Sequence, residues 1–580
     1  MKHLNIFHVI SGIRRTILCV ALCLFAGAYG ATEYFVDINR PDDNGDGKSE
    51  ETAFKTIQAA LNAAVSGDTI TVLPGEYKES PVEVADLEEE GKTSKTRLYI
   101  KKQITLRSKK GASKTHIVGA YDPQSDLGGM GPNAVRCITV RNGIGAVIKG
   151  FTIRDGAANA SLAARSDKGR VRAGGVSSQA HINSANYQAV ASSFTLVDCV
   201  VSNCVGTRGG AMYGGNAVRC LLADNRASNY GCAARQSALF NCVLTRNKLV
   251  PGQGSMETGI VAYPLSIVNC TFVGNEDTYL IVQMASLYGP VYNSLFVNNS
   301  ASICGKVSKE AKRFYNCVMP DSVAEEFTNC LVGNDFEMMA PIFDDYRLVA
   351  DAKSLKAGNA EYLSIFPEEY CTTDFEGKAR MTGDSLNVGA VQSYSTPLST
   401  LWLNNPRCDY SSLVINGRIL PKGFSQYVST DVLPVAIRIE STPRNTNPSD
   451  DYIISRYWVS EKIAWPQKDD GIDVFYPGSG VHEVFCVARP GRYVNPNPQI
   501  GSDVTGDGSK DKPYLTLQHA VNSHSDGTAV ILAAEGTYRE GGKSGQGVNN
   551  RLYVPSSATM RIKAIGDKNK TIIEGYSDPQ

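Results

Sequence analysis

The fold is decided by a stretch that recurs along the chain: residues 197–201 read VDCVV, residues 218–222 read VRCLL, and residues 240–244 read FNCVL. Further copies are VNCTF at 268–272, YNSLF at 292–296 and YNCVM at 315–319, with a last, closer copy, TNCLV, at 328–332. The first six central positions stand 21, 22, 28, 24 and 23 residues apart and are Cys199, Cys220, Cys242, Cys270, Ser294 and Cys317. A period of this length is typical of a solenoid, in which each repeat forms one coil.

Within each copy, large apolar residues alternate with the small central residue. Alternation with a period of two predicts one strand on which the first large residue, the central Cys or Ser and the last large residue face the same side. Such a strand cannot fold alone, but coils stacked about 4.8 Å apart let each strand pair with the next. An Asn stands five residues after the centre and suits an αL turn towards the next face; these are Asn225, Asn247, Asn275 and Asn299. We therefore predict an all-β solenoid, a parallel β-helix.

A second repeat links the two ends of the chain. Residues 34–77 and 493–538 share one plan: a strand opening on an aromatic residue, a Gly-Asp-Gly turn, an amphipathic helix, an apolar strand and Gly-x-Tyr. The helices are expected at 56–64 and 516–523, and Tyr77 corresponds to Tyr538. An amphipathic helix can cover the apolar cross-section and the unpaired edges of the first coil of a β-helix.

Several motifs resemble known families. AFKTIQAA at 53–60, GDTI at 67–70 and PGEY at 74–77 resemble the N-terminal cap of pectate-lyase-like right-handed parallel β-helix proteins. Residues 346–390 resemble an ending found in bacterial β-helix surface proteins, although Asn387 stands where Asp is usual. GGAM at 209–212, with Leu222 and Asn225, resembles chlamydial polymorphic outer-membrane proteins. The resemblance implies a right-handed, capped β-helix over residues 31–392.

The flanking segments predict three further parts. Residues 1–30 are typical of an export signal, because basic residues precede an apolar run at 16–26 that is too short to span a membrane. Residues 398–490 lack the coil motif and carry short strand-like runs, which predict a β-sandwich-like spacer; Cys408 and Cys486 are a candidate disulfide there. Residues 492–580 predict a cap and the first coils of a second β-helix. Because this cap has few coils to cover, we expect a fragment of a longer chain.

Charge and cysteine content restrict the partners. Fifty-eight Lys and Arg balance 58 Asp and Glu, which argues against nucleic acid or an anionic membrane as the main partner. Fifteen cysteines are present, of which 13 would remain after removal of residues 1–30, and export permits disulfides among these. The cysteines lack C-x-x-C or zinc spacing, and Ser294 replaces one of them, which favours a packing column over a metal site. No segment of the mature sequence predicts a transmembrane span, and we expect a secreted protein or one on the bacterial outer surface.

The sequence does not identify catalytic residues, a cofactor or a metal site. Asp42, Asp43, Asn44 and Asp46, with Asp503 and Asp507 in the second copy, have the composition of a calcium loop but lack the distal Glu. They favour turn formation instead. Asn298 begins an N-glycosylation sequon. Because the export signal is of bacterial type, we give glycosylation at this position little weight.

The resemblance also raises polysaccharide lyase chemistry. Elimination at a uronic acid needs a base, and calcium or arginine to neutralise the carboxylate. The nearest candidates are Asp198 and Asp224, with Arg208, Arg226, Arg235 and Arg246 along the chain. The two acids occupy different positions in the repeat, so we expect them not to stack.

Two functions remain open. The first is an exported surface or secreted β-helix that acts as a binding, adhesion or structural module, with a polysaccharide or a host or matrix surface as partner. The second is a calcium-dependent polysaccharide lyase acting on uronic-acid polymers. The sequence does not decide the oligomeric state.

Overall fold

The computed structural model describes residues 31–397 and 491–575, apart from internal segments at 86–92, 160–171, 180–191, 252–257, 277, 279, 284–288, 300–302, 304–312, 321–326, 334–336, 342–343, 525–529, 546–547 and 555–560. Between 398 and 490 it describes the strands and their pairing. The export signal predicted at 1–30 lies outside the described residues. The chain divides into two compact units, the first built mainly from residues up to Cys317 together with Asn359–Gly377.

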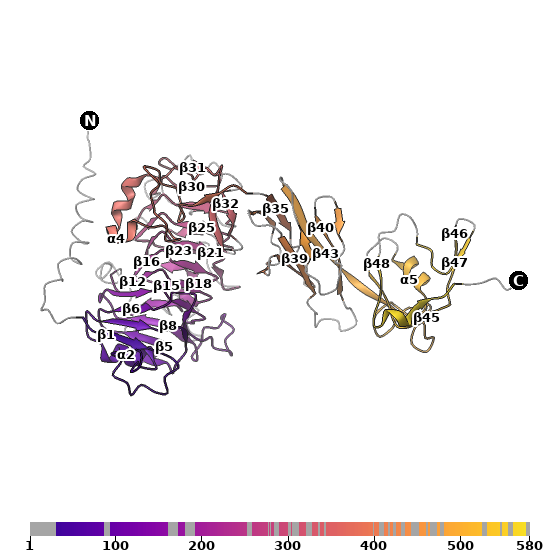
Figure 1. Ribbon diagram of the computed structural model, residues 1–580, viewed down its shortest axis with the longest axis horizontal. Helices are drawn as coiled ribbons and strands as arrows, with labels where there is room; N and C mark the ends of the chain where they lie inside the picture. Colours follow the sequence, from indigo (N-terminus) through magenta and orange to yellow (C-terminus); the bar gives the residue numbers. More distant parts are fainter. Residues whose placement is uncertain are drawn as a thin grey trace. The chain divides into compact units, whose positions relative to one another are not determined.

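The first unit is a parallel β-helix with three long sheets (Figure 1). The first sheet contains, in order, β1 (Glu33–Val36), β2 (Thr69–Val72), β6 (Thr105–Ser108), β9 (Ala146–Lys149), β12 (Phe194–Val197), β16 (Asn216–Val218), β20 (Ala238–Phe240), β24 (Ser266–Val268), β27 (Val291–Tyr292) and β29 (Phe314–Tyr315). The second contains β3 (Gly75–Tyr77), β7 (Thr115–Val118), β10 (Thr152–Arg154), β13 (Val200–Ser202), β17 (Leu221–Ala223), β21 (Val243–Thr245), β25 (Thr271–Val273) and β28 (Leu295–Val297).

The third sheet carries the candidate site described below. It contains β5 (Thr93–Ile100), β8 (Val135–Val140), β11 (Val176–Ser178), β15 (Met212–Tyr213), β19 (Ala234–Arg235), β23 (Gly259–Ala262) and β26 (Leu280–Gln283), with β4 (Val82–Ala85) antiparallel to β5. Beside it lies a short parallel sheet of β14 (Val205–Arg208), β18 (Arg226–Tyr230) and β22 (Lys248–Leu249). The predicted all-β parallel β-helix is confirmed.

The recurring motif forms a corner between two sheets, and the prediction of one straight strand was wrong. β12 ends at Val197 and β13 begins at Val200, and Asp198 between them has a φ of 53°. In the other copies, the residue just before the central position also has αL backbone: Arg219, Asn241, Asn269, Asn293 and Asn316. The corner separates the alternating residues. Val201 packs in the interior of the solenoid with Cys199. Val197 and the residues aligned with it come one position after the inward-facing row that contains Leu196, so their side chains point outward.

The second corner also differs from its prediction. Its αL residue stands one position earlier than expected, at Asp224, Arg246, Gly274 and Asn298. The following asparagines turn inward and form a hydrogen-bonded ladder. Nδ2 of Asn247 donates to the Leu222 carbonyl (2.8 Å) and to Oδ1 of Asn275 (3.0 Å), while its own Oδ1 accepts from Asn225. Asn225 and Asn275 repeat this pattern, so the ladder satisfies buried backbone groups at each corner.

A short segment, Asn359–Thr373, covers the outer side of the first sheet. It contains a 3-10 helix, η6 (Ala360–Ile365), and α4 (Glu368–Cys371). Phe366 stacks on Phe240 at 4.5 Å between ring centroids, and Tyr362 stacks on Tyr292 at 4.2 Å. The segment therefore buries the row of large side chains that the corners turn outward.

The second unit contains several further groups of paired strands. β30 (Val318–Met319) pairs with β31 (Leu331–Val332), and β33 (Asp345–Val349) pairs with β32 (Met338–Ala340) and β34 (Tyr394–Ser395). One sheet orders β38 (Ser425–Thr430), β35 (Ser399–Asn404), β43 (Val481–Val494), β40 (Tyr452–Val459) and β41 (Lys462–Ala464). Another orders β37 (Arg418–Ile419), β36 (Ser411–Ile415), β39 (Val435–Ser441) and β42 (Asp473–Phe475). The domain boundaries stay predictions, and Cys408 lies outside the described residues.

The end of β43 enters the second copy of the leader. There it pairs in parallel with β44 (Val530–Ala533), which pairs with β48 (Arg561–Ala564). β45 (Gly536–Tyr538) pairs with β49 (Thr571–Ile573), after a 3-10 turn, η7 (Lys568–Lys570). β46 (Lys543–Gly545) and β47 (Val548–Asn550) form a hairpin.

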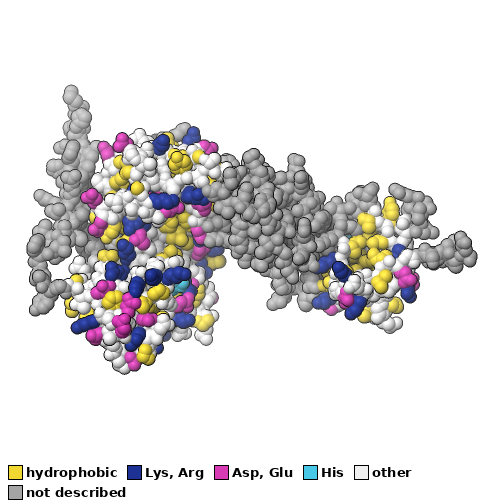
Figure 2. All heavy atoms as spheres, in the orientation of Figure 1, with side chains coloured by type: hydrophobic (Ala, Val, Ile, Leu, Met, Phe, Trp, Pro, Cys, Tyr) yellow, Lys and Arg dark blue, Asp and Glu magenta, His cyan; other side chains and the backbone are white. Residues whose placement is uncertain are grey.

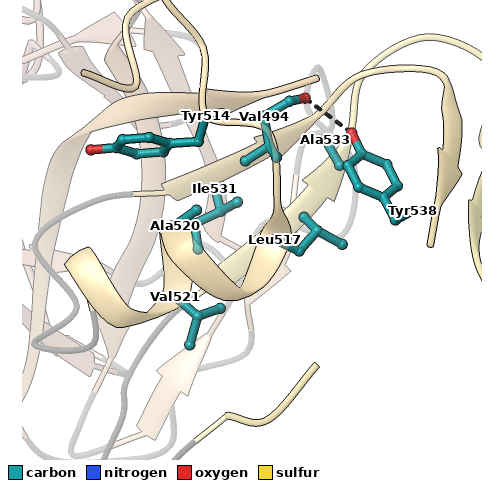
Figure 3. Close-up of a cluster of buried hydrophobic side chains, with 8 residues drawn as sticks. All are labelled: Val494, Tyr514, Leu517, Ala520, Val521, Ile531, Ala533 and Tyr538. Atoms are coloured by element: carbon teal, nitrogen blue, oxygen red, sulfur yellow. Dashed lines mark hydrogen bonds between the residues drawn. The ribbon is translucent and has the colours of Figure 1, made fainter. Parts of the chain in front are cut away.

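The two leader copies share their interior contacts, and both predicted helices are confirmed. These are α2 (Ile57–Ala63) in the first unit and α5 (Leu517–Ser523) in the second. Figure 3 shows α5 beneath its strands, with the Tyr538 hydroxyl donating to the Val494 carbonyl (3.0 Å). Tyr77 donates in the same way to the Val36 carbonyl (3.4 Å).

Candidate functional site

The candidate site lies on the outer side of the third sheet. The strand register places Tyr213 beside Arg235, Arg235 beside Ala262, and Ala262 beside Gln283. The residues just before them on their strands, Met212, Ala234 and Val261, are fully buried in the solenoid interior. Because side chains alternate along a strand, the row that holds Arg235 points to the opposite face.

Arginines and tyrosines alternate across this face, which we call the Arg–Tyr cluster: Arg172, Arg208, Tyr213, Tyr230, Arg235, Tyr263 and Gln283. The Arg235 guanidinium lies between two rings, 4.8 Å from the Tyr230 centroid and 5.0 Å from that of Tyr263. Arg208 lies 5.7 Å from the Tyr230 ring, and Arg172 lies 5.5 Å from the Tyr213 ring. These are cation–π distances.

Arg235 is the member that points to a ligand. Its side chain is buried, at 8% exposure, and its Nε and Nη1 atoms have no hydrogen-bond partner among the residues that the structure describes. Burial lowers the pKa of Arg235, and repulsion from Arg208 lowers it further. A buried cation is costly unless it is paired. The cluster thus holds positive charge and two unfilled donors.

An unfilled acceptor stands two strands away from these donors in the same sheet. Gln283 donates from Nε2 to the Tyr263 hydroxyl (3.2 Å), while its buried Oε1 has no partner in the described part of the chain. The cluster therefore offers donors for an anion, an acceptor for a hydroxyl, and tyrosine rings. The asparagine ladder advances by 22 residues from Asn225 to Asn247. The same interval separates Arg208 from Tyr230 and Tyr213 from Arg235, which pair on neighbouring strands. Counting 22 residues from each arginine could therefore have identified these tyrosines from the sequence.

The acids proposed for lyase chemistry lie elsewhere. Asp198 pairs with Arg219 (2.6 Å from Oδ1 to Nε), and Asp224 pairs with Arg246 (3.0 Å from Oδ2 to Nη2). The two acids occupy different corners, as predicted, and each faces an arginine from the next coil. Among the residues that the structure describes, no group of three or more His, Cys, Asp or Glu side chains is placed to hold a metal ion.

The four predicted arginines separate into two groups. Arg208 and Arg235 join the cluster, whereas Arg246 is held by Asp224 and Arg226 lies 5.7 Å from the Tyr121 ring. Figure 2 shows Lys and Arg side chains interspersed with Asp and Glu over the visible face of the first unit. Surface cations with acidic neighbours are ordinary solvated charge, and Arg235 differs from them by being buried and unpaired.

The acidic loops and the cysteines have structural roles in the described residues. Asp43 accepts from the backbone and hydroxyl of Thr56, and Asp503 does the same for Thr516. Asp42, Asp46 and Asp507 each accept a backbone N–H two residues on. The ten described cysteines are free thiols. Burial raises the pKa values of the Cys199, Cys220 and Cys242 thiols, so they are poor nucleophiles.

Comparison with known proteins adds little to this geometry. No known protein family and no curated protein sequence matches the chain. Among solved structures, it is similar to a rhamnogalacturonan lyase (12% identity, TM-score 0.28, 50% of this chain and 87% of that one) and a pectate lyase (12%, 0.28, 62% and 96%). A lacto-N-biosidase from Eubacterium ramulus is similar at 9% identity and a TM-score of 0.23, over 49% of this chain and 66% of that one. These similarities accord with the parallel β-helix and carry no argument about function.

No helix among the described residues is long and apolar enough to cross a membrane. The cap and chlamydial resemblances stay predictions.

Proposed function

We propose that this chain is an exported β-helix protein that binds an acidic carbohydrate at the Arg–Tyr cluster. The observation that carries the proposal is the buried, unpaired guanidinium of Arg235 between Tyr230 and Tyr263. An anion that accepts from Nε and Nη1 would satisfy both donors and neutralise the buried charge. Arginine is suited to this task because its planar fork matches a carboxylate.

The rest of the cluster favours a sugar as the carrier of the anion. Tyrosine combines an apolar ring face with a polar hydroxyl, and both Tyr230 and Tyr263 flank the guanidinium. The free Oε1 of Gln283 can accept from a hydroxyl group. A sugar acid offers all three features together: a flat apolar face, hydroxyls and a negative group. A carboxylate or a sulfate ester supplies the same charge, and the experiment below separates them.

Binding is favoured over cleavage by the charges that lie within the cluster. Its named members include three arginines and no carboxylate, so the cluster itself supplies no Asp or Glu side chain that could act as the base in proton abstraction. The nearest candidates from the sequence, Asp198 and Asp224, are committed to Arg219 and Arg246. Balanced charge over the whole chain also disfavours nucleic acid as the anionic partner.

The test is calorimetric titration of the full chain with matched polymers: polygalacturonate against its fully methyl-esterified form, and chondroitin sulfate against unsulfated chondroitin. We expect binding to polygalacturonate and loss of binding on esterification. An Arg235→Gln variant removes a charge-assisted contact of about 1.5–3 kcal/mol, so affinity should fall roughly 10- to 100-fold.

The matched control is Arg246→Gln, which removes a cation already paired with Asp224 and should leave the affinity unchanged. Equal binding of the neutral and acidic polymers, or unchanged binding by Arg235→Gln, would refute the site. Absorbance of the unsaturated product is recorded in parallel, with and without calcium. Its appearance would replace the binding function by lyase chemistry.

A further inference from the structure

The cysteine column ends in a pair that differs from its other members. Tyr315 pairs in parallel with Thr328, and the Asn316 N–H donates to the Thr328 carbonyl (3.0 Å). This register places Cys330 directly beside Cys317. The Cys317 N–H donates to Sγ of Cys330 (3.3 Å).

Serine already occupies the same position two coils earlier. The Cys270 N–H donates to Oγ of Ser294 (3.2 Å), which in turn donates to the Tyr292 carbonyl (2.9 Å). Cys330 accepts from Cys317 and donates to the Thr328 carbonyl (3.7 Å) in the same way. Serine can therefore meet the structural demand of this position, and a thiol at Cys330 adds reactivity that the backbone contacts do not require.

Exposure also separates Cys330 from the column. Cys199, Cys220, Cys242, Cys270 and Cys317 are buried, whereas Cys330 is partly exposed. The hydrogen bond from Cys317 lowers the pKa of Cys330, while burial raises that of Cys317. The pair thus combines a partly exposed thiol whose pKa is lowered with a buried thiol directly beside it, the arrangement of an attacking and a resolving cysteine.

We propose that Cys317 and Cys330 are a redox-active thiol pair that closes to a disulfide when the protein meets a low-molecular-weight disulfide. Directly paired parallel strands lie about 4.8 Å apart, within the roughly 4.4–6.8 Å between Cα atoms that a disulfide spans. The bond covalently ties Cys330 to the coil before it. The inference is independent of the carbohydrate site.

The reaction balances as thiol–disulfide exchange. The Cys330 thiolate attacks one sulfur of glutathione disulfide, whose S–S bond breaks to release one glutathione thiolate. The Cys317 thiol gives its proton to water, and its sulfur then attacks the Cys330 sulfur, expelling the second glutathione thiolate. Two cysteine thiols are oxidised, and one glutathione disulfide is reduced to two thiols.

The experiment equilibrates the folded full chain in graded glutathione redox buffers, blocks free thiols by alkylation, and digests with an endoproteinase that cleaves after glutamate. Cleavage after Glu325 and Glu326 separates the two cysteines, so only a disulfide keeps their peptides together. We expect this linked pair by mass spectrometry, at more reducing potentials than any other cysteine oxidation. Cys317→Ser should stop at glutathione on Cys330, and Cys330→Ser should leave Cys317 unoxidised.

Cys220→Ser is the matched control within the column and should form the same linked pair as the unchanged chain. Circular dichroism of each variant verifies the fold, which Ser294 indicates serine will preserve. The proposal is overturned if Cys330 stays alkylated at every potential, if glutathione remains on Cys330 while Cys317 is free, or if Cys330 links to another cysteine.

Discussion

Replacing Arg235 by methionine should stabilise the ligand-free protein. Two buried nitrogens of Arg235 lack acceptors among the described residues, and each unsatisfied donor costs about 1–3 kcal/mol. Against this stand two tyrosine contacts, each contributing about 1–2 kcal/mol when desolvated. Methionine keeps most of the apolar stem and adapts to irregular space. The balance favours Arg235→Met by about 1–2 kcal/mol, or a rise of roughly 2–6 °C in the melting temperature of the first unit.

The assay is differential scanning calorimetry of the full chain without ligand, following the transition assigned to the β-helix, since a multi-unit chain does not melt in one step. Arg246→Met is the control with the opposite expected sign, because Arg246 is paired with Asp224 through Nε and Nη2. It should lower the same transition by an amount corresponding to about 1 kcal/mol or less, since Asp224 is exposed. A melting temperature lowered by Arg235→Met would show that the cation serves the fold, and would refute the argument for a ligand.

Three further predictions concern the solenoid itself. Asn247→Ala removes the bonds to Leu222 and Asn275 and should destabilise the β-helix by about 2–4 kcal/mol, seen as a lower melting temperature, whereas an unchanged value would mean that the ladder carries no stability. Thr56→Ala removes the helix cap over the Ala59 N–H and should cost about 1 kcal/mol in the first unit alone, with Thr516→Ala acting in the second; a shared effect on both transitions would contradict this. The column thiols keep their protons in the folded state because burial raises their pKa values, while unfolded thiols ionise near about pH 8.5. The unfolded state then binds fewer protons, so stability is fully present below that pH and falls above it by about 1.4 kcal/mol per pH unit and thiol. Urea midpoints under reducing conditions at pH 7 and 9.5 should show this loss, with Cys220→Ser less sensitive; equal sensitivity would contradict it.

The inward-facing part of the fold could be predicted from the sequence because it repeats. Cys199, Cys220 and Cys242 occupy one column, and the interval between them is the coil length. The helix at Ile57–Ala63 was likewise predictable, since its pattern recurs at Leu517–Ser523. Such features depend on local alternation and on copies of themselves, both of which a single sequence contains.

The corners and the outer rows were harder to predict. A residue such as Arg219 gives no local sign of αL backbone, because the conformation is imposed by stacking on the Asp198 corner. The covering segment around Phe366 is distant in sequence from Phe240, on which it stacks. The Arg–Tyr cluster depends on coil lengths that vary between 21 and 28 residues, so its register follows only when every coil is assigned.

The regular stacking of the solenoid shows which side chains the position of Arg235 can accept. Its neighbours in the same outer row are Tyr213 and Ala262, and both are accommodated there. The fold at this position therefore accepts an aromatic or a small apolar side chain without any charge. A cation that the architecture does not require, buried with two donors unfilled, raises the energy of the ligand-free state. Because the same row elsewhere meets its packing needs with neutral side chains, we infer that the charge of Arg235 serves binding and not folding.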